Sequence, residues 1–556
     1  MLYLDLKVVF TVVALLIATA IIACKVIVET KRDLHPIALG EQANVGPTRK
    51  ENETAIYRNF TVPPGFPLTT GMGLSMGYRL RNGNFGDIWS SIMSLSNENY
   101  VEIDNQKHSL GELNAIAKHL CHTLMPENET GRLGISSSVY KYPGFALTIA
   151  GFMGSLRGLV PVILHSVPRS KQNLDALAIE SWDTFHQMNG SHEWYKMVIV
   201  CNSTKGQRPN AQLNNVVTWE ELISELEEDQ QFEYAPPKDN SHDSKVIFLS
   251  SSPYGFYSSF THMALVSSIA AYIKSFPMDN ELSGKDHLSI VVEEKTDSYD
   301  PTQIMPKLLA TLLHGGSASI LSPPSGQQLD QCMNKSTTLL QIAQNSPLLD
   351  SLLDQSWNLP QRLKLAWASN LLSEGVFTSS ALAWPSLKNL RCVYLADQVK
   401  DVKSVITMHF TTINSDHAPK KSRSTETLNR MRALLGSRVV VELYSPYVVL
   451  GPIASTNFFD YRVFPSQVDS KLTKYGPICT SLEAKLVKAE NSPQYLVTDR
   501  QGMLCIRGFT IGRPVEEHRQ KTAFEIVEKF DGGEGWMPMV GVFCLWGKDG
   551  CLYEFK

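Results

Sequence analysis

The sequence lacks the cysteine patterns that mark a metal centre or a disulfide framework. Its nine cysteines are odd in number and scattered, and no Cys-x-x-Cys pair or Cys/His ligand spacing occurs. An excess of one charge is also missing, because 51 basic residues stand against 55 acidic residues, and so the footprint of a nucleic-acid-binding protein is absent. The composition, 43% hydrophobic and 19% charged over 556 residues, is that of a globular protein with several subdomains. We therefore expect reduced core cysteines, no metal site and no nucleic-acid partner.

Long uncharged apolar runs are missing everywhere except at the amino terminus. Val8 to Cys24 carries no charge, and with Lys25 snorkelling the run continues through Val28, near the ~20 residues that a membrane-spanning helix needs. A signal peptide cleaved near Ala18-Thr19-Ala20 is the alternative. The spanning helix is favoured because Ile21-Ile22-Ala23 continues the apolar run past that site. We expect residues 1–30 to be a single transmembrane anchor.

Charges around this run favour a body in the cytosol. Lys7 precedes the run, partly offset by Asp5, whereas Lys25, Lys31 and Arg32 lie at its other end. Six Asn-x-Ser/Thr sequons would favour the opposite side if they were glycosylated: Asn52, Asn59, Asn128, Asn189, Asn202 and Asn334. A long chain meets this pattern by accident, and we keep the cytosolic orientation. The polar, proline-containing residues 31–75 are expected to form a linker between the anchor and the body.

The stretch from Lys245 to Ala271 has the layout of a phosphate-binding loop. Val246-Ile247-Phe248 predicts a buried strand, and Thr261-His262 opens an apolar helix. Between them lie small and hydroxyl-bearing residues whose side chains and backbone N–H groups could face an anion, and the candidate binding residues are Ser250, Ser251, Ser252 and Gly255. No Lys or Arg occurs between Lys245 and Lys274. The layout of a nucleotide loop is present, but most of its chemistry is missing.

Alternating strand and helix signals around this stretch predict an α/β fold. Ser109 is a plausible N-cap of an amphipathic helix, with Glu112 three residues later. Residues 133–135, 145–156 and 160–164 read as a strand, a helix and a parallel strand. Further segments repeat the pattern: a strand at 197–200, a capped helix from 218, a helix over 306–313 and strands at 318–321, 390–396 and 438–443.

Taken in order, these blocks resemble the adenylate-forming superfamily of acyl-CoA synthetases, fatty acyl-AMP ligases and luciferases. Leu249-Ser250-Ser251-Ser252 stands where that family has Thr-Ser-Gly-Thr, and Thr261-His262 matches its Thr-His. The strand ending at Tyr444 is similar to the family's strand before Tyr-Gly-x-Thr-Glu. Gly502-Met503-Leu504-Cys505-Ile506-Arg507-Gly508 resembles Gly-Glu-Leu-x-Val-Arg-Gly, and Gly535-Trp536 the family's later Gly-Trp.

The resemblance implies specific roles, and most of the residues that would fill them are replaced. The loop lysine falls on Phe256, to within one position. Tyr447 stands at the phosphate-contacting Thr, Val448 at the magnesium-associated Glu and Gly541 at the ribose-binding Asp. A valine cannot ligate a hard cation, which needs oxygen donors. Tyr444 alone matches, and by this resemblance it would stack on adenine.

The resemblance also implies an organisation of the chain. After the anchor and linker we expect a first α/β subdomain over 76–245, a second over 246–442 with the degenerate phosphate loop, and a smaller β-rich third subdomain over 443–556. The family's C-terminal catalytic domain, which carries its catalytic lysine, is expected to be absent. A surface that this domain would cover would then be open to another protein.

These replacements favour a membrane-anchored, catalytically inactive relative of acyl-CoA synthetases that binds a protein partner or a lipid such as a fatty acid. No catalytic residue and no cofactor are expected, because losing a single transition-state donor can cost ~10²–10³ in rate. The alternative is an active, diverged AMP-forming acyl-CoA synthetase or acyl-AMP ligase that uses ATP, magnesium and coenzyme A. A role in lipid metabolism at the endoplasmic reticulum is expected by analogy with single-anchor lipid enzymes.

Overall fold

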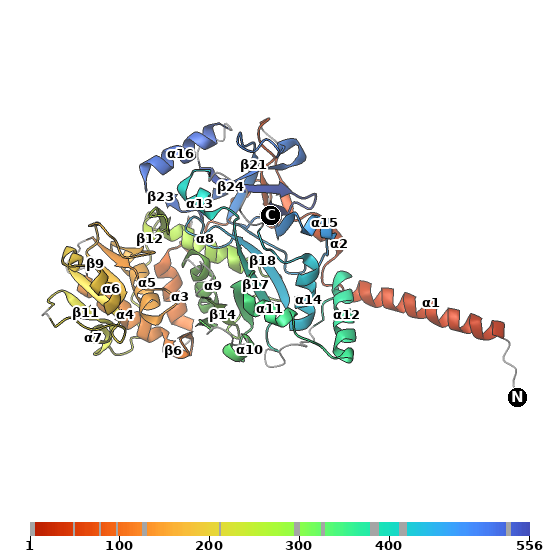
Figure 1. Cartoon of the computed structure of the whole chain (residues 1–556), viewed down its shortest axis with the longest axis horizontal. Helices are drawn as coiled ribbons and strands as arrows, with labels where there is room; N and C mark the ends of the chain where they lie inside the picture. The colour runs from red at the N-terminus through yellow and green to blue at the C-terminus, as the bar shows by residue number, and fades with distance from the viewer. Residues whose placement is uncertain are drawn as a thin grey trace.

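The computed structural model describes residues 6–47, 50–76, 79–95, 98–124, 130–210, 213–293, 301–323, 329–378, 388–410, 420–529 and 535–556. One helix, α1, projects away from a body in which helices and sheets are packed together (Figure 1). The other helices belong to the body, and the described ones are α2 (Pro36–Gly40), α3 (Phe85–Leu95), α4 (Leu110–Leu124), α5 (Tyr142–Ser155), α6 (Trp182–Gln187), α7 (Trp219–Ile223), α8 (His262–Ile273), α9 (Pro301–Leu313), α10 (Leu329–Cys332), α11 (Pro347–Leu353), α12 (Leu359–Ser373), α13 (Val402–Thr407), α14 (Thr425–Leu435), α15 (Ser466–Asp469) and α16 (Glu517–Glu528). The described residues also form short 3-10 helices at Ser191–Trp194 and Val497–Asp499.

Helix α1 spans Leu6–Lys31, and within it Val8–Lys31 is long and apolar enough to cross a membrane. None of this segment is buried against the body, and large side chains such as Phe10 and Leu15 are exposed along it. It is the one such helix among the described residues. Its position at the amino terminus also fits a signal sequence, the alternative considered above.

The first sheet has eight strands and contains the predicted phosphate-loop strand. Its order from edge to edge is β11 (Val216–Thr218), β10 (Met197–Asn202), β9 (Ala176–Ser181), β7 (Gly131–Ile135), β8 (Leu159–Ile163), β12 (Val246–Ser251), β13 (Tyr257–Thr261) and β23 (Arg513–Pro514). Strands β7 and β8 are parallel and α5 crosses between them, which confirms the predicted βαβ unit. Strand β13 was not predicted, and it turns the expected strand–loop–helix into a hairpin followed by a helix.

The second sheet also has eight strands, and most of its pairs are parallel. Its order is β19 (Ala454–Ser455), β18 (Arg438–Tyr444), β17 (Cys392–Gln398), β16 (Leu339–Ala343), β14 (His287–Val291), β15 (Ser317–Leu321), β5 (Tyr100–Ile103) and β6 (Gln106–Ser109). Strands β5 and β6 come from the predicted first subdomain, so the sheets exchange strands across the predicted boundary at 245/246.

The third sheet is antiparallel and has seven strands. Its order is β1 (Ala43–Val45), β2 (Tyr57–Asn59), β21 (Leu482–Val487), β22 (Gln501–Gly508), β24 (Met537–Trp546), β25 (Leu552–Phe555) and β20 (Leu472–Gly476). A separate hairpin joins β3 (Leu74–Met76) to β4 (Arg79–Arg81). The segment 31–75, predicted as a linker, thus supplies two strands to this sheet, and the Tyr57 ring stacks on Trp546 with 4.0 Å between centroids. Composition alone could not reveal this, because the pairing partners lie more than 400 residues away.

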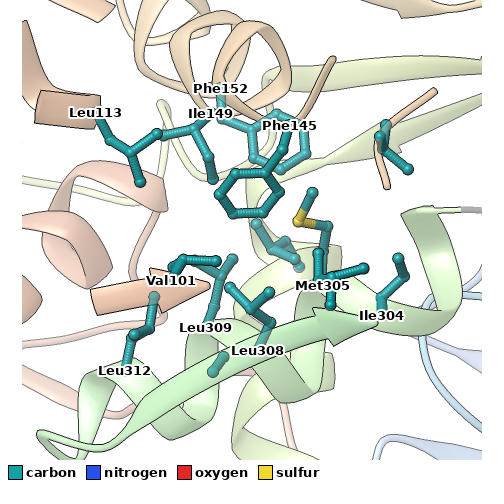
Figure 2. Packing of buried hydrophobic residues seen from close by; sticks show 14 of the residues in the cluster. Val101, Leu113, Phe145, Ile149, Phe152, Ile304, Met305, Leu308, Leu309 and Leu312 are labelled. Carbon is teal, nitrogen blue, oxygen red and sulfur yellow. The ribbon is translucent and has the colours of Figure 1, made fainter. Parts of the chain in front are cut away.

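The largest hydrophobic core lies between the first two sheets. Helix α5 packs against α4 on one side, and its Phe145, Ile149 and Phe152 face α9 across the core (Figure 2). Helix α9 contributes Met305 and Leu309 from the other side. These helices are apolar on the faces that meet, as burial between two sheets requires.

Helix α9 begins at Pro301, five residues before the predicted start at Pro306. A proline inside a helix has no N–H, and the carbonyl four residues earlier loses its helical partner. Here that carbonyl belongs to Thr302, and it accepts a hydrogen bond from the Gly451 backbone N–H at 2.8 Å. Pro306 therefore does not end α9. The carbonyl that it leaves without a helical partner instead bonds the turn after β18 to the helix.

Candidate functional site

The predicted phosphate loop is a tight turn between β12 and β13 whose polar groups bond to one another. The Ser252 N–H donates to the Phe256 carbonyl at 2.8 Å, and the Phe256 N–H donates to the Ser252 hydroxyl at 3.2 Å. Gly255 takes φ +77° and donates its N–H back to the Ser252 carbonyl at 3.1 Å. Ser250, Ser251 and Ser252 are all buried. The loop follows the predicted strand, but the N–H groups of Ser252, Gly255 and Phe256 donate to other groups within the turn.

Helix α16 covers the outer side of this turn. The Glu516 carboxylate, just before the helix, accepts from the Tyr257 N–H at 2.6 Å. Arg519 donates to the Tyr257 carbonyl at 3.0 Å and to Glu516 at 2.7 Å, and its guanidinium lies over the Phe256 ring at 5.1 Å. Arg519 therefore places a buried cation beside the loop, but this cation is paired with the Glu516 carboxylate three residues before it.

Three replaced positions come together in one hydrophobic cluster. Phe256, Tyr447 and Val448 pack in the same group of apolar side chains, with Val448 completely buried. Tyr447 adopts φ +63°, a left-handed conformation that costs an L-residue roughly 1–2 kcal/mol. At these three positions, where the resemblance implied charged phosphate and magnesium contacts, the side chains belong to an apolar cluster.

The space beside Gly541 is taken by a carboxylate from another element. Gly541 lies in β24 with φ +83°, and an ideal Cβ there would lie 2.8 Å from Oδ2 of Asp401. Asp401 is the N-cap of α13, and its Oδ1 accepts from the Ser404 N–H at 2.9 Å. An aspartate at position 541 would therefore meet a like charge as well as backbone strain.

Tyr444, the one residue that matches the resemblance, is buried beneath an ion pair. Its hydroxyl donates to Oε2 of Glu442 at 2.8 Å, and the same oxygen forms a salt bridge with Nζ of Lys307. The side chains of Lys307 and Glu442 are only 1% and 2% exposed. Burial, and then the neighbouring Glu442 charge, raises the pKa of Tyr444 well above its usual value. The ring faces protein on all sides and has no open face for a base.

Lys307 sits in a cage of aromatic rings. Its Nζ lies 3.9 Å from the centroid of Tyr394, 5.4 Å from Tyr272 and 5.9 Å from Tyr444. Burial lowers the pKa of Lys307, and the Glu442 carboxylate opposes that shift. The thiol of Cys392 lies nearby, and burial raises its pKa to about 12. These contacts make a closed electrostatic centre between α9 and the strands β17 and β18.

This centre was not predicted from the sequence, although a signal existed. Lys307 is the lone charge on the apolar face of α9, and Glu442 is the lone charge in the run Val439-Val440-Val441-Glu442-Leu443. An isolated charge in an otherwise buried element requires a partner, because an unpaired charge is very costly to bury. Searching for such isolated charges would have paired Lys307 with Glu442.

His262, from the Thr-His pair, has a structural role. Thr261 caps α8, its hydroxyl accepting from the Ala264 N–H at 3.2 Å, as expected. The His262 Nδ1 accepts from the Phe85 N–H at 3.3 Å, so the proton belongs on Nε2, which donates to the Ser155 hydroxyl at 3.2 Å. Burial lowers the pKa of His262 from 6.5 to about 3. The neutral ring joins α3, α5 and α8.

The residues at this site do not fit magnesium-bound ATP. A triphosphate would meet Phe256, Tyr447 and Val448 in place of a cation, a hydroxyl and a carboxylate, and charge-assisted contacts are the strong ones in such sites. Within the described ranges, no three His, Cys, Asp or Glu side chains are grouped to hold a metal ion. Among the described residues, these positions are occupied by apolar packing and internal ion pairs.

Comparison with other sequences gives one close relative in yeast. No protein-family profile matches the chain. The uncharacterized protein YHR045W of Saccharomyces cerevisiae is 44% identical over 560 residues, and the match covers 99% of each chain.

Comparison with solved structures gives the fold. The luciferase-like enzyme of the nonluminescent Zophobas morio mealworm superposes with a TM-score of 0.56 at 13% identity, covering 88% of this chain and 99% of that one. The N-terminal domain of FACL13 from Mycobacterium tuberculosis gives 0.51 at 11% identity, covering 85% and 99%, and a benzoate CoA ligase from Burkholderia xenovorans gives 0.52 at 14%, covering 85% and 79%. The predicted adenylate-forming fold is therefore confirmed.

Proposed function

Because this chain belongs to the same protein family as yeast YHR045W and has the adenylate-forming fold, we propose that it is a membrane-anchored, catalytically inactive relative of the AMP-forming ligases. It acts by binding a protein partner or a lipid, in lipid metabolism. The proposal rests on one observation above all: the position expected to bind adenine, Tyr444, is sealed by the Lys307–Glu442 pair.

Two features of the site support inactivity together. The loop N–H groups at Ser252, Gly255 and Phe256 are used inside the turn and cannot also bind phosphate. The region implied for magnesium is an apolar cluster. Phosphoryl and adenylyl transfer depend on placed charges, and a site without them has no means of stabilising the transition state.

Two open grooves away from the sealed site support a binding role. One, of about 730 Å³, lies between α12 and α14, with Trp357, Leu365, Arg362 and Arg430 in its walls. The other, of about 900 Å³, lies beside α6 and the loop after β8. Both volumes are in the range of small-molecule sites, and the first pairs cations with apolar walls, as an amphipathic ligand requires.

We propose that α1 remains in the mature protein as a single membrane-spanning anchor, with the body in the cytosol at the endoplasmic reticulum. The helix continues without a break from Leu6 to Lys31, past the possible cleavage site at residues 18–20. Two sequon amides are engaged in the fold: Asn59 donates to the Ile478 carbonyl and Asn334 to Glu102. Retention after alkaline carbonate extraction, and no mobility change with endoglycosidase, are the expected results.

The decisive experiment is a thermal-shift measurement on the full chain in detergent with millimolar Mg-ATP, alongside fatty-acid-dependent pyrophosphate exchange. We expect neither a shift nor exchange above background. A ligand at 100 times its dissociation constant would stabilise the fold by about 2.7 kcal/mol, so useful binding could not be missed. A benzoate CoA ligase provides the positive control. A clear shift together with exchange would replace this proposal by a diverged, active ligase that uses ATP, magnesium and coenzyme A.

The binding half of the proposal has its own test. The full chain is purified from membranes after mild crosslinking, and the product is analysed by native mass spectrometry. We expect a defined protein companion or a bound lipid in stoichiometric amount. A chain that emerges alone and lipid-free would contradict this half while leaving the sealed site untouched.

A further inference from the structure

Helix α12 exposes a row of large apolar side chains on one face. Leu359, Leu363 and Trp367 are 70%, 64% and 61% exposed, and their spacing of four residues places them along one side of the helix. The opposite side carries Ala368 and Leu372, which are buried in a small cluster. We call Leu359, Leu363 and Trp367 the α12 face. Packing inside the body does not account for it.

The C-terminal end of α12 lies where α1 leaves the body. Arg32, the residue after α1, donates from Nε to the Glu374 carbonyl at 2.9 Å, and the Asp33 N–H donates to the Gly375 carbonyl at 3.1 Å. Glu374 is the C-cap of α12. Figure 1 shows α12 at the end of the body from which α1 projects, running across the direction of α1.

This junction is held from a second side. The Asp33 carboxylate pairs with Arg438 at 3.2 Å and accepts from the Tyr461 hydroxyl at 2.7 Å. An ideal Cβ on Gly375 would lie 3.0 Å from Cγ of Arg32, so the two segments are in close contact. The position of α12 relative to α1 is therefore set by named contacts.

These observations place the C-terminal end of α12 at the depth of lipid headgroups. The apolar run of α1 ends at Val28, and Arg32 follows four residues later, about 6 Å along a helix. The polar layer on each side of a bilayer is roughly 5–8 Å thick. The residues that bond to α12 thus lie within that layer when α1 spans the membrane.

We propose that the α12 face is a second membrane contact, lying in the interface of the leaflet on the body's side, with lipid as its occupant. This inference rests on the anchoring in the proposed function. Tryptophan concentrates at the membrane interface, and leucines on the same face enter the acyl boundary. Arg362 and Lys364, both exposed on α12, suit anionic headgroups. Ile37 on α2, just after α1, adds a further exposed apolar side chain.

The test uses the full chain in nanodiscs with single cysteines labelled by an environment-sensitive fluorophore. Cys24, which is exposed, Cys479, which is half-buried, and Cys332 are replaced by Ser in the background, and the buried cysteines are kept. The reporter is L363C. K521C on α16, whose native side chain is 77% exposed, serves as the control on an element far from α1 (Figure 1). I17C, within α1, reports on the anchor itself. Quenchers are lipid-attached nitroxides at headgroup and deep acyl positions, and aqueous iodide.

We expect headgroup nitroxide to lower the fluorescence of labelled L363C at least twofold and iodide to leave it unchanged. At K521C, iodide should lower the fluorescence and headgroup nitroxide should leave it unchanged. Deep nitroxide should quench I17C. Replacing both Leu359 and Trp367 by Ser in the L363C protein should reduce its nitroxide quenching by at least half. These positions are exposed, so the melting temperature in detergent should stay the same.

The other outcomes separate the two proposals. Quenching of I17C with iodide access at L363C overturns the α12 contact and leaves the anchor intact. Protection of L363C from iodide without nitroxide quenching means that protein covers the face, either a second copy or a partner, and also overturns it. An unquenched I17C removes the anchor, and the α12 contact with it.

Discussion

The closed centre around Lys307 and the end of the body around α12 are opposites. In the centre, charged side chains are buried, and each charge lies against a partner or an aromatic ring. At α12, large apolar side chains are left in the open. Burying a charge costs desolvation free energy unless the charge is paired, and large exposed apolar patches are uncommon on folded proteins. Each feature therefore marks a region where a requirement other than simple core packing decides the sequence.

The difference indicates which surface of the fold is available to bind other molecules. A binding cleft needs donors aimed outward, whereas the donors at the old nucleotide loop bond to one another. The α12 end, by contrast, offers unpartnered apolar area, a groove and cations beside the segment proposed to enter the membrane. This contrast supports the proposal that the centre has a structural role and that binding takes place at the edge of the body.

The largest expected effect comes from breaking the central ion pair. Replacing Lys307 by Met leaves Glu442 buried without its cation, and losing one partner of such a pair costs about 3–5 kcal/mol of unfolding free energy. Urea denaturation of the detergent-solubilised chain measures the loss.

The double variant K307M/E442Q is the matched control. It removes both charges and keeps an oxygen that can accept from Tyr444, and we expect it to recover more than half of the loss. If K307M alone were as stable as the parent, the centre could not be the closed unit described here.

Restoring the aspartate at position 541 should damage the fold. The substitution G541D combines a left-handed backbone with a carboxylate pressed against Asp401, and we expect a cost of about 2–3 kcal/mol. The control is G190D: Gly190 has φ +87°, and nothing lies within 4 Å of an ideal Cβ there. It should cost only about 1 kcal/mol. Equal costs at the two glycines would mean that Asp401 does not fill the space.

Acid should loosen the packing of α3, α5 and α8 through His262. Its pKa is 6.5 when unfolded and about 3 when folded, so below pH 6.5 only the unfolded chain takes up the proton, and stability falls as the pH falls. From pH 6.5 to 5 this contributes a loss of about 2 kcal/mol, at 1.36 kcal/mol per unit.

Burial also lowers the pKa of His287, to about 4, so His287 makes the stability fall with pH in the same way. The contribution of His262 alone is therefore obtained by comparing the parent with the variant H262N. Melting temperatures from pH 7 to 5 should fall less steeply in the variant. Parallel curves would contradict a buried, neutral His262.

The smallest effect belongs to the other region. The variant L363E/W367E changes two exposed side chains, and surface substitutions usually alter stability by less than about 0.5 kcal/mol. Melting in detergent should therefore match the parent. A large loss would mean that the α12 face packs against the body, and the contrast between the two regions would disappear.

The sequence predicted those parts of the fold whose signals are local. The βαβ unit around α5, the Thr261 cap and the strand ending at Tyr444 all follow from apolar runs and capping residues within a few positions. The adenylate-forming fold followed from the order of such blocks.

Long-range contacts were missed, because no local pattern records them. The pairing of β2 with β21 depends on a strand more than 400 residues away, so residues 31–75 were read as a linker. Strand β16 was not predicted, since its five buried apolar or amide residues fit a strand or a helix equally well. The Lys307–Glu442 pair joins α9 to β18, and the Asp401 carboxylate reaches Gly541 from a different element. Each is a tertiary contact between segments that look ordinary on their own.

The contacts of Arg32 and Asp33 have a mechanical consequence. In the proposed anchoring, the apolar run over residues 8–28 measures about 32 Å, close to the ~30 Å hydrocarbon layer, and in a thinner bilayer such a helix would tilt to keep its apolar length inside. Because Arg32 and Asp33 bond to the C-terminal end of α12, this tilt would turn the body together with the helix. A thinner bilayer would then lean the body further toward the membrane surface than a thicker one.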